Sequence, residues 1–244
     1  MSPPVTAAAW QIGAHSERGA RRGTNMDAVL IHAETGVVVL ADGMGSTPRG
    51  AEAAAMAVAA FGDRLAGAAV HDEADVHAAI AAAQEQVVAE FAADGTLTGA
   101  TTLCAVVAGR EGLLVVHVGD SRCHRLHDGV LTALTTDHTV AAHLVAVGAA
   151  EPDSPLARRT ANHLRRYLGN PAGATADVIP HRPAPGESVL LSTDGLHGML
   201  STRQMADILL ADDDPGRSAR RLVVAAAAAG GTDDATAVVV RPSR

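Results

Sequence analysis

The sequence predicts an α+β fold in which two mostly antiparallel β-sheets are stacked and flanked by helix pairs, a four-layer α-β-β-α sandwich. Two patterns predict this class. Short apolar runs rich in β-branched residues follow one another through glycine-containing turns, which is typical of β-hairpins. Longer alanine-rich segments with helical spacing stand in pairs between the groups of strands. Because only 2% of the residues are aromatic, Ala, Val and Leu must fill the core.

Turn signals separate the expected strands. Residues 34–36 end in glycine and join the second strand to the third as a hairpin, and residues 127–130 contain an Asp-Gly turn of the kind that joins two antiparallel strands. The expected strands cover, in chain order, residues 10–14, 28–33, 37–41, 101–108, 113–118, 122–127, 130–134, 189–193 and 235–240.

The expected helices have boundary signals of their own. The second helix has an apolar stripe that includes Val76 and Ile80. Ser201 and Gln204 have the spacing of a capping box, and Pro215 suits the first turn of the last helix. The expected helices cover residues 50–65, 72–92, 139–147, 201–210 and 215–229.

Length and charge limit the classes of function. The 244 residues show no linker or shift of composition, which predicts a single domain over residues 1–244. The formal net charge of −8 argues against a nucleic-acid partner, which requires a basic surface. No apolar run reaches the ~18 residues of a membrane span, so we expect no membrane partner.

The two cysteines and the N-terminus predict the compartment. Cys104 and Cys123 fall in apolar, strand-like runs, which favours buried and reduced thiols. The first residues do not combine a basic segment with an apolar one, so they do not form a secretion signal. We therefore expect a cytoplasmic protein, and we expect it to be a monomer.

Aspartates stand at the ends of several apolar runs. The run over residues 37–40 leads through alanine into Asp42, the runs before Asp120 and Asp194 end in a similar way, and Asp233 precedes the last strand. A single Asp-Gly pair is common turn chemistry. Carboxylates gathered at one end of a sheet repel one another unless a cation holds them. The repetition therefore predicts a cation site.

The ligand type predicts the metal and its chemistry. Oxygen ligands without His or Cys at metal-binding spacing favour Mg²⁺ or Mn²⁺ over Zn²⁺. Two such ions about 3.5–4 Å apart can hold a shared water and lower its pKa from about 15.7 towards 7, and that hydroxide could attack phosphorus in line. The arginine-rich loop over residues 15–27 offers guanidinium groups that bind phosphate oxygens in pairs.

A series of short motifs follows these features along the chain. The motifs are, in order, Gly19-x-x-Arg22-x-x-Asn25-x-Asp27, Ala41-Asp42-Gly43-Met44-Gly45 with Gly50-x-Glu52, Gly99-Ala100-Thr101-Thr102, His117-Val118-Gly119-Asp120-Ser121-Arg122, Thr136-Asp137-His138-Thr139, Ser192-Thr193-Asp194-Gly195 and Gly230-Gly231-Thr232-Asp233. In this order and spacing they resemble the motifs of the type 2C metal-dependent Ser/Thr protein phosphatases (the PPM family) in their short bacterial form. The resemblance spans about residues 12–241.

The resemblance implies a set of metal ligands. Asp42 would bridge two Mn²⁺ or Mg²⁺ ions, Asp194 and Asp233 would complete the first, and the carbonyl of Gly43 would join the second. Asp120 and Asp194 would serve a third, weaker site.

The resemblance also implies the substrate side of the reaction. Arg22 would hold the substrate phosphate, and Asp27 would orient a metal-bound water or ligate the second ion. Hydroxide bridging the metals would then hydrolyse phosphoserine and phosphothreonine on proteins, and the natural partners would be Ser/Thr kinases and their substrates. Residues 138–165 correspond to the family's variable flap, near the substrate entrance.

Two departures from the family pattern leave alternatives open. Met26 stands where relatives often have Glu or Gln, and Asp234 replaces the usual Asn, where it either tightens metal binding or faces solvent. These changes are compatible with a pseudophosphatase that binds phosphoproteins without cleaving them. A metal phosphoesterase acting on small molecules is a further alternative.

Other polar residues are interpreted as structural. We expect His117 to be buried and hydrogen-bonded, Asp137 to cap the following helix, and Arg122 to form an ion pair. Thr101 and Thr102 begin a strand and are expected to pack under the site.

Overall fold

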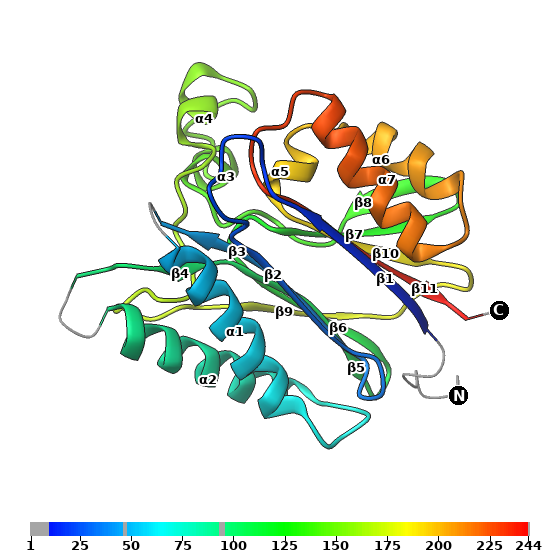
Figure 1. The fold of residues 1–244 in the computed structure, drawn as a ribbon, viewed down its shortest axis with the longest axis horizontal. Coiled ribbons are helices and arrows are strands. Elements are labelled where there is room, and N and C mark those ends of the chain that lie inside the picture. The colour runs from blue at the N-terminus through cyan, green and yellow to red at the C-terminus, as the bar shows by residue number, and fades with distance from the viewer. Residues whose placement is uncertain (1–9, 46–47, 93–95, 244) are drawn as a thin grey trace.

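The apolar runs form two antiparallel sheets that lie at the centre of the molecule (Figure 1). The computed structural model describes residues 10–45, 48–92 and 96–243. The first sheet has the strand order β1-β11-β10-β7-β8. Its strands are β1 (Trp10–Glu17), β7 (Arg122–His127), β8 (Val130–Ala133), β10 (Ser188–Ser192) and β11 (Ala235–Pro242).

The second sheet has the order β2-β3-β5-β6-β9, with a short strand, β4, paired to the end of β3. Its strands are β2 (Asp27–His32), β3 (Val37–Met44), β4 (Ala100–Thr101), β5 (Leu103–Gly109), β6 (Gly112–Val118) and β9 (Asp177–His181). Every pairing in both sheets is antiparallel.

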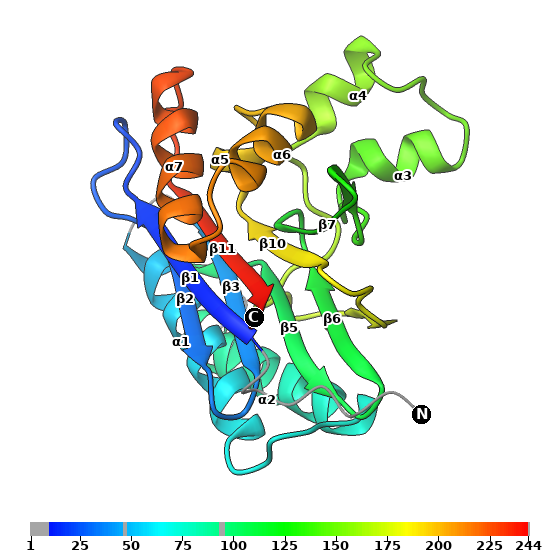
Figure 2. The same ribbon diagram turned by 90° about the vertical axis from the view of Figure 1, so that its right-hand side faces the viewer.

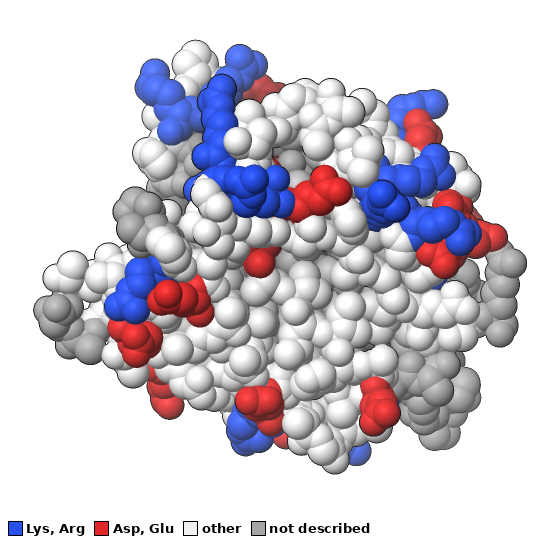
Figure 3. Space-filling view, viewed as in Figure 1, with Lys and Arg blue, Asp and Glu red and all other residues white. Residues whose placement is uncertain are grey.

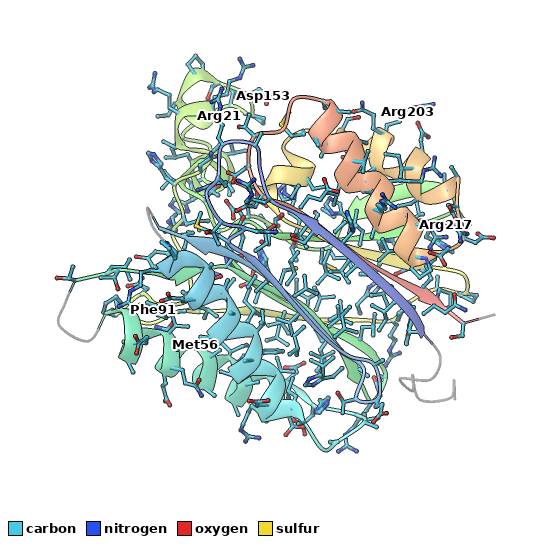
Figure 4. The ribbon with its side chains drawn as sticks, viewed as in Figure 1. Arg21, Met56, Phe91, Asp153, Arg203 and Arg217 are labelled. Carbon is cyan, nitrogen blue, oxygen red and sulfur yellow. The ribbon has the colours of Figure 1, made fainter. Side chains whose placement is uncertain are left out.

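Helices cover the outer face of each sheet (Figures 1 and 2). The pair α1 (Arg49–Leu65) and α2 (Glu73–Phe91) packs on the second sheet, and Figure 4 shows Met56 and Phe91 in this layer. The helices α5 (Asp194–His197), α6 (Thr202–Leu210) and α7 (Pro215–Ala228) lie on the first sheet. Two further helices, α3 (Val140–Ala146) and α4 (Pro155–Thr160), project from one end of the sheets in Figure 2.

Strand alternation explains the layers. On β3, Val37 and Val39 face the α1–α2 pair, whereas Val38 and Leu40 face the other sheet. Residues of the first sheet, such as Leu191 on β10, complete the core between the two sheets. The α-β-β-α sandwich predicted from the sequence is confirmed.

Some elements differ from the prediction. Strand β9 was not expected, because it has only five residues and contains Pro180, a residue that lacks the amide donor of a strand interior. Helix α4 lies in the segment interpreted as the variable flap, for which no such helix was predicted, and α5 is a single short turn with no periodicity to detect. The capping box at Ser201 and the first-turn position of Pro215 are confirmed.

Among the described residues, no helix combines the length and the apolar character needed to cross a bilayer.

Candidate metal and active site

Asp42 lies inside strand β3 rather than at its end, because the strand continues to Met44 by pairing with β4. Two threonines fix the peptide groups around it. The amide of Asp42 donates to Oγ1 of Thr102 (2.9 Å), and Oγ1 of Thr101 donates to the carbonyl of Asp42 (2.9 Å). Both threonines are buried, so the expectation that they pack under the site is confirmed.

Gly43 is required by a close approach of three chain segments. A Cβ atom at this position would lie 2.2 Å from the carbonyl oxygen of Gly50 and 2.7 Å from that of Met26. The amide of Gly43 also donates to the Met26 carbonyl (3.0 Å). Only glycine allows this contact, which brings the loop before β2 and the start of α1 against the strand that carries Asp42.

Three further aspartates come together from the other elements. Asp194 begins α5 directly after β10, Asp233 precedes β11, and Asp120 follows β6. All three line an open cavity of about 310 Å³. Two flap residues, Ala161 and Asn162, line the same cavity.

The pKa shifts reflect how near these carboxylates lie to one another and to Asp42. Burial raises the pKa of Asp42 well above its usual value, and repulsion from Asp27, Asp194, Asp120 and Asp233 raises it further. Burial and the neighbouring Asp194 raise the pKa of Asp120 to about 7. Burial and the charge of Asp233 raise the pKa of Asp194, although a hydrogen bond with Asp42 opposes the shift.

Such a group of acids fits hard divalent cations. The ligand atoms are carboxylate oxygens, the type that Mg²⁺ and Mn²⁺ prefer, and a cation would remove the repulsion that raises the pKa values. The aspartates come from both sheets, so the two layers of the sandwich meet at this site.

Asp27 lies directly beside Asp42, since the two residues are partners in the β2–β3 ladder. Its Oδ2 accepts hydrogen bonds from Oγ1 of Thr193 (3.0 Å) and Oγ1 of Thr236 (2.5 Å). Its Oδ1 is buried and has no hydrogen-bond partner among the described residues. Burial raises the pKa of Asp27 to about 7 in spite of the two hydroxyl donors. One carboxylate oxygen of Asp27 is thus left to accept from a ligand.

Arg22 lies in the loop between β1 and β2 and reaches Asp233. Its Nε and Nη2 donate to the two carboxylate oxygens at 2.6 and 2.8 Å. Burial acts to raise the pKa of Asp233, but the hydrogen bonds from Arg22 and from the backbone amide of Asp234, together with the charge of Arg22, outweigh it and leave that pKa below its usual value. Figure 4 shows the neighbouring Arg21 on the outer part of the same loop, and its side chain is exposed. The loop thus directs one arginine into the site.

Asp234 holds this loop in place. Its two carboxylate oxygens accept from the backbone amides of Gly19 and Met26, each at 2.8 Å, and the residue is 3% exposed. Asp234 was expected either to tighten metal binding or to face solvent. The carboxylate does not face solvent, and it instead binds backbone amides at both ends of the loop that carries Arg22. The contact spans more than 200 residues of sequence, so no local pattern could indicate it.

Arg122 and Asp137 form an ion pair at the edge of the cavity. Nε and Nη2 of Arg122 donate to the two oxygens of Asp137 at 2.8 and 2.7 Å, which confirms the structural role expected for Arg122. The prediction that Asp137 caps the next helix is wrong. Thr139 is the N-cap of α3 and accepts from the amide of Ala142, because Asp137 is engaged by the arginine.

His117 is buried as expected, but the predicted hydrogen bond is wrong. Neither ring nitrogen has a partner among the described residues. The residue lies on β6, which is buried along its whole length, and its ring centroid lies 4.4 Å from that of His138. Burial lowers the pKa of His117 to about 4, and the Asp137 and Asp177 carboxylates and the backbone at Ser121 offset this only in part.

The charges on the surface are unevenly placed. In Figure 3 most of the basic side chains on this face lie in its upper part, where Figure 1 places the flap, the loop between β1 and β2, and helices α6 and α7. Acidic side chains lie among these basic ones in the same part of the view, although the basic side chains are fewer in the lower part (Figure 3).

Comparison with known proteins supports the resemblance expected from the motifs. The model of the protein phosphatase 2C family matches residues 14–213. The Ser/Thr protein phosphatase PstP of Mycobacterium tuberculosis is 32% identical over 207 residues, which cover 80% of this chain and 38% of PstP. This chain therefore spans about two fifths of the length of that relative.

Solved structures show the same architecture. The PPM Ser-Thr phosphatase MsPP of Mycobacterium smegmatis, in complex with cacodylate, is 32% identical with a TM-score of 0.83, covering 98% of this chain and 99% of that one. The catalytic domain of PstP in complex with 2 manganese ions is 31% identical with a TM-score of 0.83, covering 97% of this chain and 99% of that one. By its sequence and its fold, the chain belongs to the protein phosphatase 2C family.

Proposed function

We propose that this protein hydrolyses phosphoserine and phosphothreonine on other proteins, with two or three Mn²⁺ or Mg²⁺ ions as cofactors. The observation that carries the proposal is the meeting of Asp42, Asp194 and Asp233 from different layers of the sandwich, with Arg22 beside them. The family supports the reaction class, and the PstP structure with manganese supports the metal.

The aspartates are the proposed metal ligands. Asp42 would bridge two ions, Asp194 and Asp233 would complete the first, the carbonyl of Gly43 would join the second, and Asp120 would serve a third with Asp194. When bound, the cations supply Lewis-acid chemistry that lowers the pKa of water and stabilises charge on a transferring phosphoryl group. The shared burial and raised pKa values of Asp42, Asp120 and Asp194 support this assignment.

Arg22 is the proposed phosphate-binding residue. Its guanidinium already donates in parallel to two oxygens of one anionic group, Asp233. Two oxygens of a phosphate monoester present the same pairwise arrangement, so the same N–H groups suit the substrate. Arg22 would orient the phosphorus and neutralise part of its charge.

Asp27 is the proposed acceptor for the attacking water. Thr193 and Thr236 fix one carboxylate oxygen, which leaves the buried Oδ1 available to accept a hydrogen bond from water. A carboxylate held in this way directs a water lone pair toward phosphorus and can take up its proton.

The proposal also covers the domain organisation, the flap and the partners of the protein. We infer that residues 1–244 form one catalytic domain, with residues 138–165 as a flap beside the substrate; Ala161 and Asn162 on the cavity wall support the second point. The proposed partners are Ser/Thr kinases and their phosphorylated substrates, met in the cytoplasm by a monomeric enzyme.

The decisive assay follows hydrolysis of p-nitrophenyl phosphate and of a phosphothreonine peptide with Mn²⁺, and then with EDTA. We expect turnover of both substrates with Mn²⁺, none after chelation, and none for Asp42→Ala. Turnover that survives EDTA contradicts the proposal. Peptide binding without turnover at saturating Mn²⁺ would instead identify a pseudophosphatase, and turnover confined to small phosphate esters would identify a phosphoesterase of another substrate class.

A further inference from the structure

A second group of possible ligands lies at the base of the flap, and it shares no residue with the aspartate site. His117 is on β6, His138 directly precedes the N-cap of α3, and Asp177 begins β9. One nitrogen or oxygen atom from each side chain lies within 4.8 Å of the other two. Three separate segments of chain therefore present two imidazoles and a carboxylate to one point.

His117 is the residue that most needs a partner. It is 0% exposed, and neither Nδ1 nor Nε2 has a hydrogen-bond partner among the described residues. A buried polar group without a partner destabilises the folded state, and such groups in native proteins often mark an ion or ligand site. Because burial lowers its pKa, the imidazole is neutral near pH 7, the form that binds metals.

His138 and Asp177 are already spaced like two ligands of one ion. Nε2 of His138 lies 3.1 Å from Oδ2 of Asp177. In a tetrahedral zinc site with bonds of 2.0–2.1 Å, ligand atoms lie about 3.3 Å apart. The side chain of Asp177 is 42% exposed, so an ion can reach the group from solvent on that side.

The positively charged guanidinium of Arg166 already lies beside His138 and Asp177. Nη1 of Arg166 lies 2.8 Å from Oδ1 of Asp177 and 3.1 Å from Nε2 of His138. Its side chain is 42% exposed and can swing into solvent. An incoming metal must displace this guanidinium. His138 must also give up its 3.1 Å hydrogen bond to Asp177 and the 3.2 Å hydrogen bond that its Nδ1 accepts from the amide of Gly119, since coordination through Nε2 moves the ring proton to Nδ1.

We propose that His117, His138 and Asp177 form a binding site for one divalent transition-metal ion of the zinc class, with solvent completing its coordination. Two imidazole nitrogens and one carboxylate suit Zn²⁺, whereas Mg²⁺ prefers oxygen ligands alone. The ion would join β6, the start of the flap and β9. It would be chemically distinct from the cations of the all-oxygen aspartate site.

The test measures Zn²⁺ binding to the full chain by competition with a chromophoric zinc chelator, in excess Mg²⁺ that fills oxygen-only sites. The wild type should bind one Zn²⁺ that Mg²⁺ does not displace. His117→Gln and Asp177→Asn should each weaken binding at least about tenfold, the scale on which metal sites respond to lost contacts. Arg166→Ala should bind Zn²⁺ more tightly than the wild type, because it removes the competing cation.

Two controls separate this site from others. His71→Gln removes another buried histidine with an unpartnered Nε2, which lies beside Gly109 at the far end of β5, and it should leave Zn²⁺ binding unchanged. Asp42→Asn should also leave it unchanged, because Asp42 belongs to the aspartate site.

Two results would overturn the proposal. The first is that neither the wild type nor Arg166→Ala binds Zn²⁺ in the presence of excess Mg²⁺. The second is that Asp42→Asn loses Zn²⁺ binding whereas His117→Gln keeps it. Circular dichroism without metal checks that each variant folds. If His117→Gln does not fold, the half-exposed Asp177→Asn decides the matter alone, and unchanged affinity in that variant contradicts the site.

Discussion

At the scale of single residues, the site gathers aspartates whose carboxylates repel one another in the absence of a cation. Burial and four neighbouring aspartates make the negative charge of Asp42 unfavourable, and this shows in its raised pKa. A residue kept for catalysis at the expense of stability responds to substitution in a characteristic way: activity falls while the stability of the metal-free protein rises.

Asp42→Asn tests this opposition. The amide keeps the size of the side chain but removes the charge, so in EDTA at pH 7.5 we expect the free energy of unfolding to rise by about 1–3 kcal/mol. Turnover with Mn²⁺ should fall below detection. Urea unfolding and the phosphothreonine assay measure the two effects. Asp63→Asn, at an exposed site on α1, is the control and should change neither; an Asp42→Asn variant that keeps its activity would contradict the assigned role.

Arg22→Ala tests phosphate binding. Loss of two charge-assisted hydrogen bonds to the phosphate should lower kcat/KM by about 100-fold, equivalent to about 2.7 kcal/mol. Arg22→Lys should recover little of this, because an ammonium group cannot donate in parallel. Arg21→Ala removes a neighbouring exposed arginine and serves as the control. Equal losses in the two alanine variants would mean that the loop acts only through its overall charge.

At the scale of elements, the loop between β1 and β2 depends on a contact from the other end of the chain. Asp234 binds the amides of Gly19 and Met26, and Gly19 is packed so tightly that a Cβ would lie 2.4 Å from the carbonyl oxygen of Thr232. The segment that leads into β11 therefore positions the loop, and the loop positions Arg22.

Asp234→Ala should release this loop. Two buried amides lose their acceptor, which should lower the free energy of unfolding by about 2–4 kcal/mol. Because Arg22 loses its support, KM for the phosphopeptide should rise more than kcat falls. Asp213→Ala, an exposed acid before α7, controls for charge. If Asp234→Ala has normal stability and normal KM, the loop is held by other contacts.

The elements also show what a sequence can and cannot predict. The strands of the core and the aspartates were predictable, because apolar runs that end in Asp-Gly repeat along the chain. The partners of Asp27 were not, because Thr193 and Thr236 lie 166 and 209 residues away from it. Asp137 had the local signal of a helix cap, but a tertiary ion pair with Arg122 prevailed. Strand β9 was not predicted, because it contains Pro180, which lacks the amide donor of a strand interior.

At the scale of the whole molecule, the two sheets are joined at one end by groups that carry like charge. The pKa values of Asp27 and Asp120 rise from 3.8 to about 7, chiefly through burial. Between these values the folded protein binds more protons than the unfolded chain. The contribution of these two aspartates to the free energy of unfolding therefore falls as the pH rises through this window, whereas the buried His117 and His124, whose pKa values are lowered to about 4, contribute in the opposite direction.

Metal removal should therefore reveal a distinctive pH profile. The free energy of unfolding with saturating Mn²⁺ should exceed that in EDTA by an amount that grows by about 1–3 kcal/mol between pH 5 and pH 7.5. The difference grows because the cation binds the ionised carboxylates, and the contribution of the buried histidines cancels in the comparison. Urea unfolding at several pH values measures both profiles. A manganese effect on stability that does not grow between pH 5 and pH 7.5 would show that these carboxylates do not gather around the cation.

The central claim is that the two sheets bring Asp42, Asp194 and Asp233 together around divalent cations. The most direct measurement is anomalous diffraction at the manganese edge from crystals soaked in Mn²⁺. We predict manganese peaks in contact with Asp42 from one sheet and with Asp194 and Asp233 from the other. Crystals in which manganese binds only elsewhere, or in which these three carboxylates lie apart, would contradict the account.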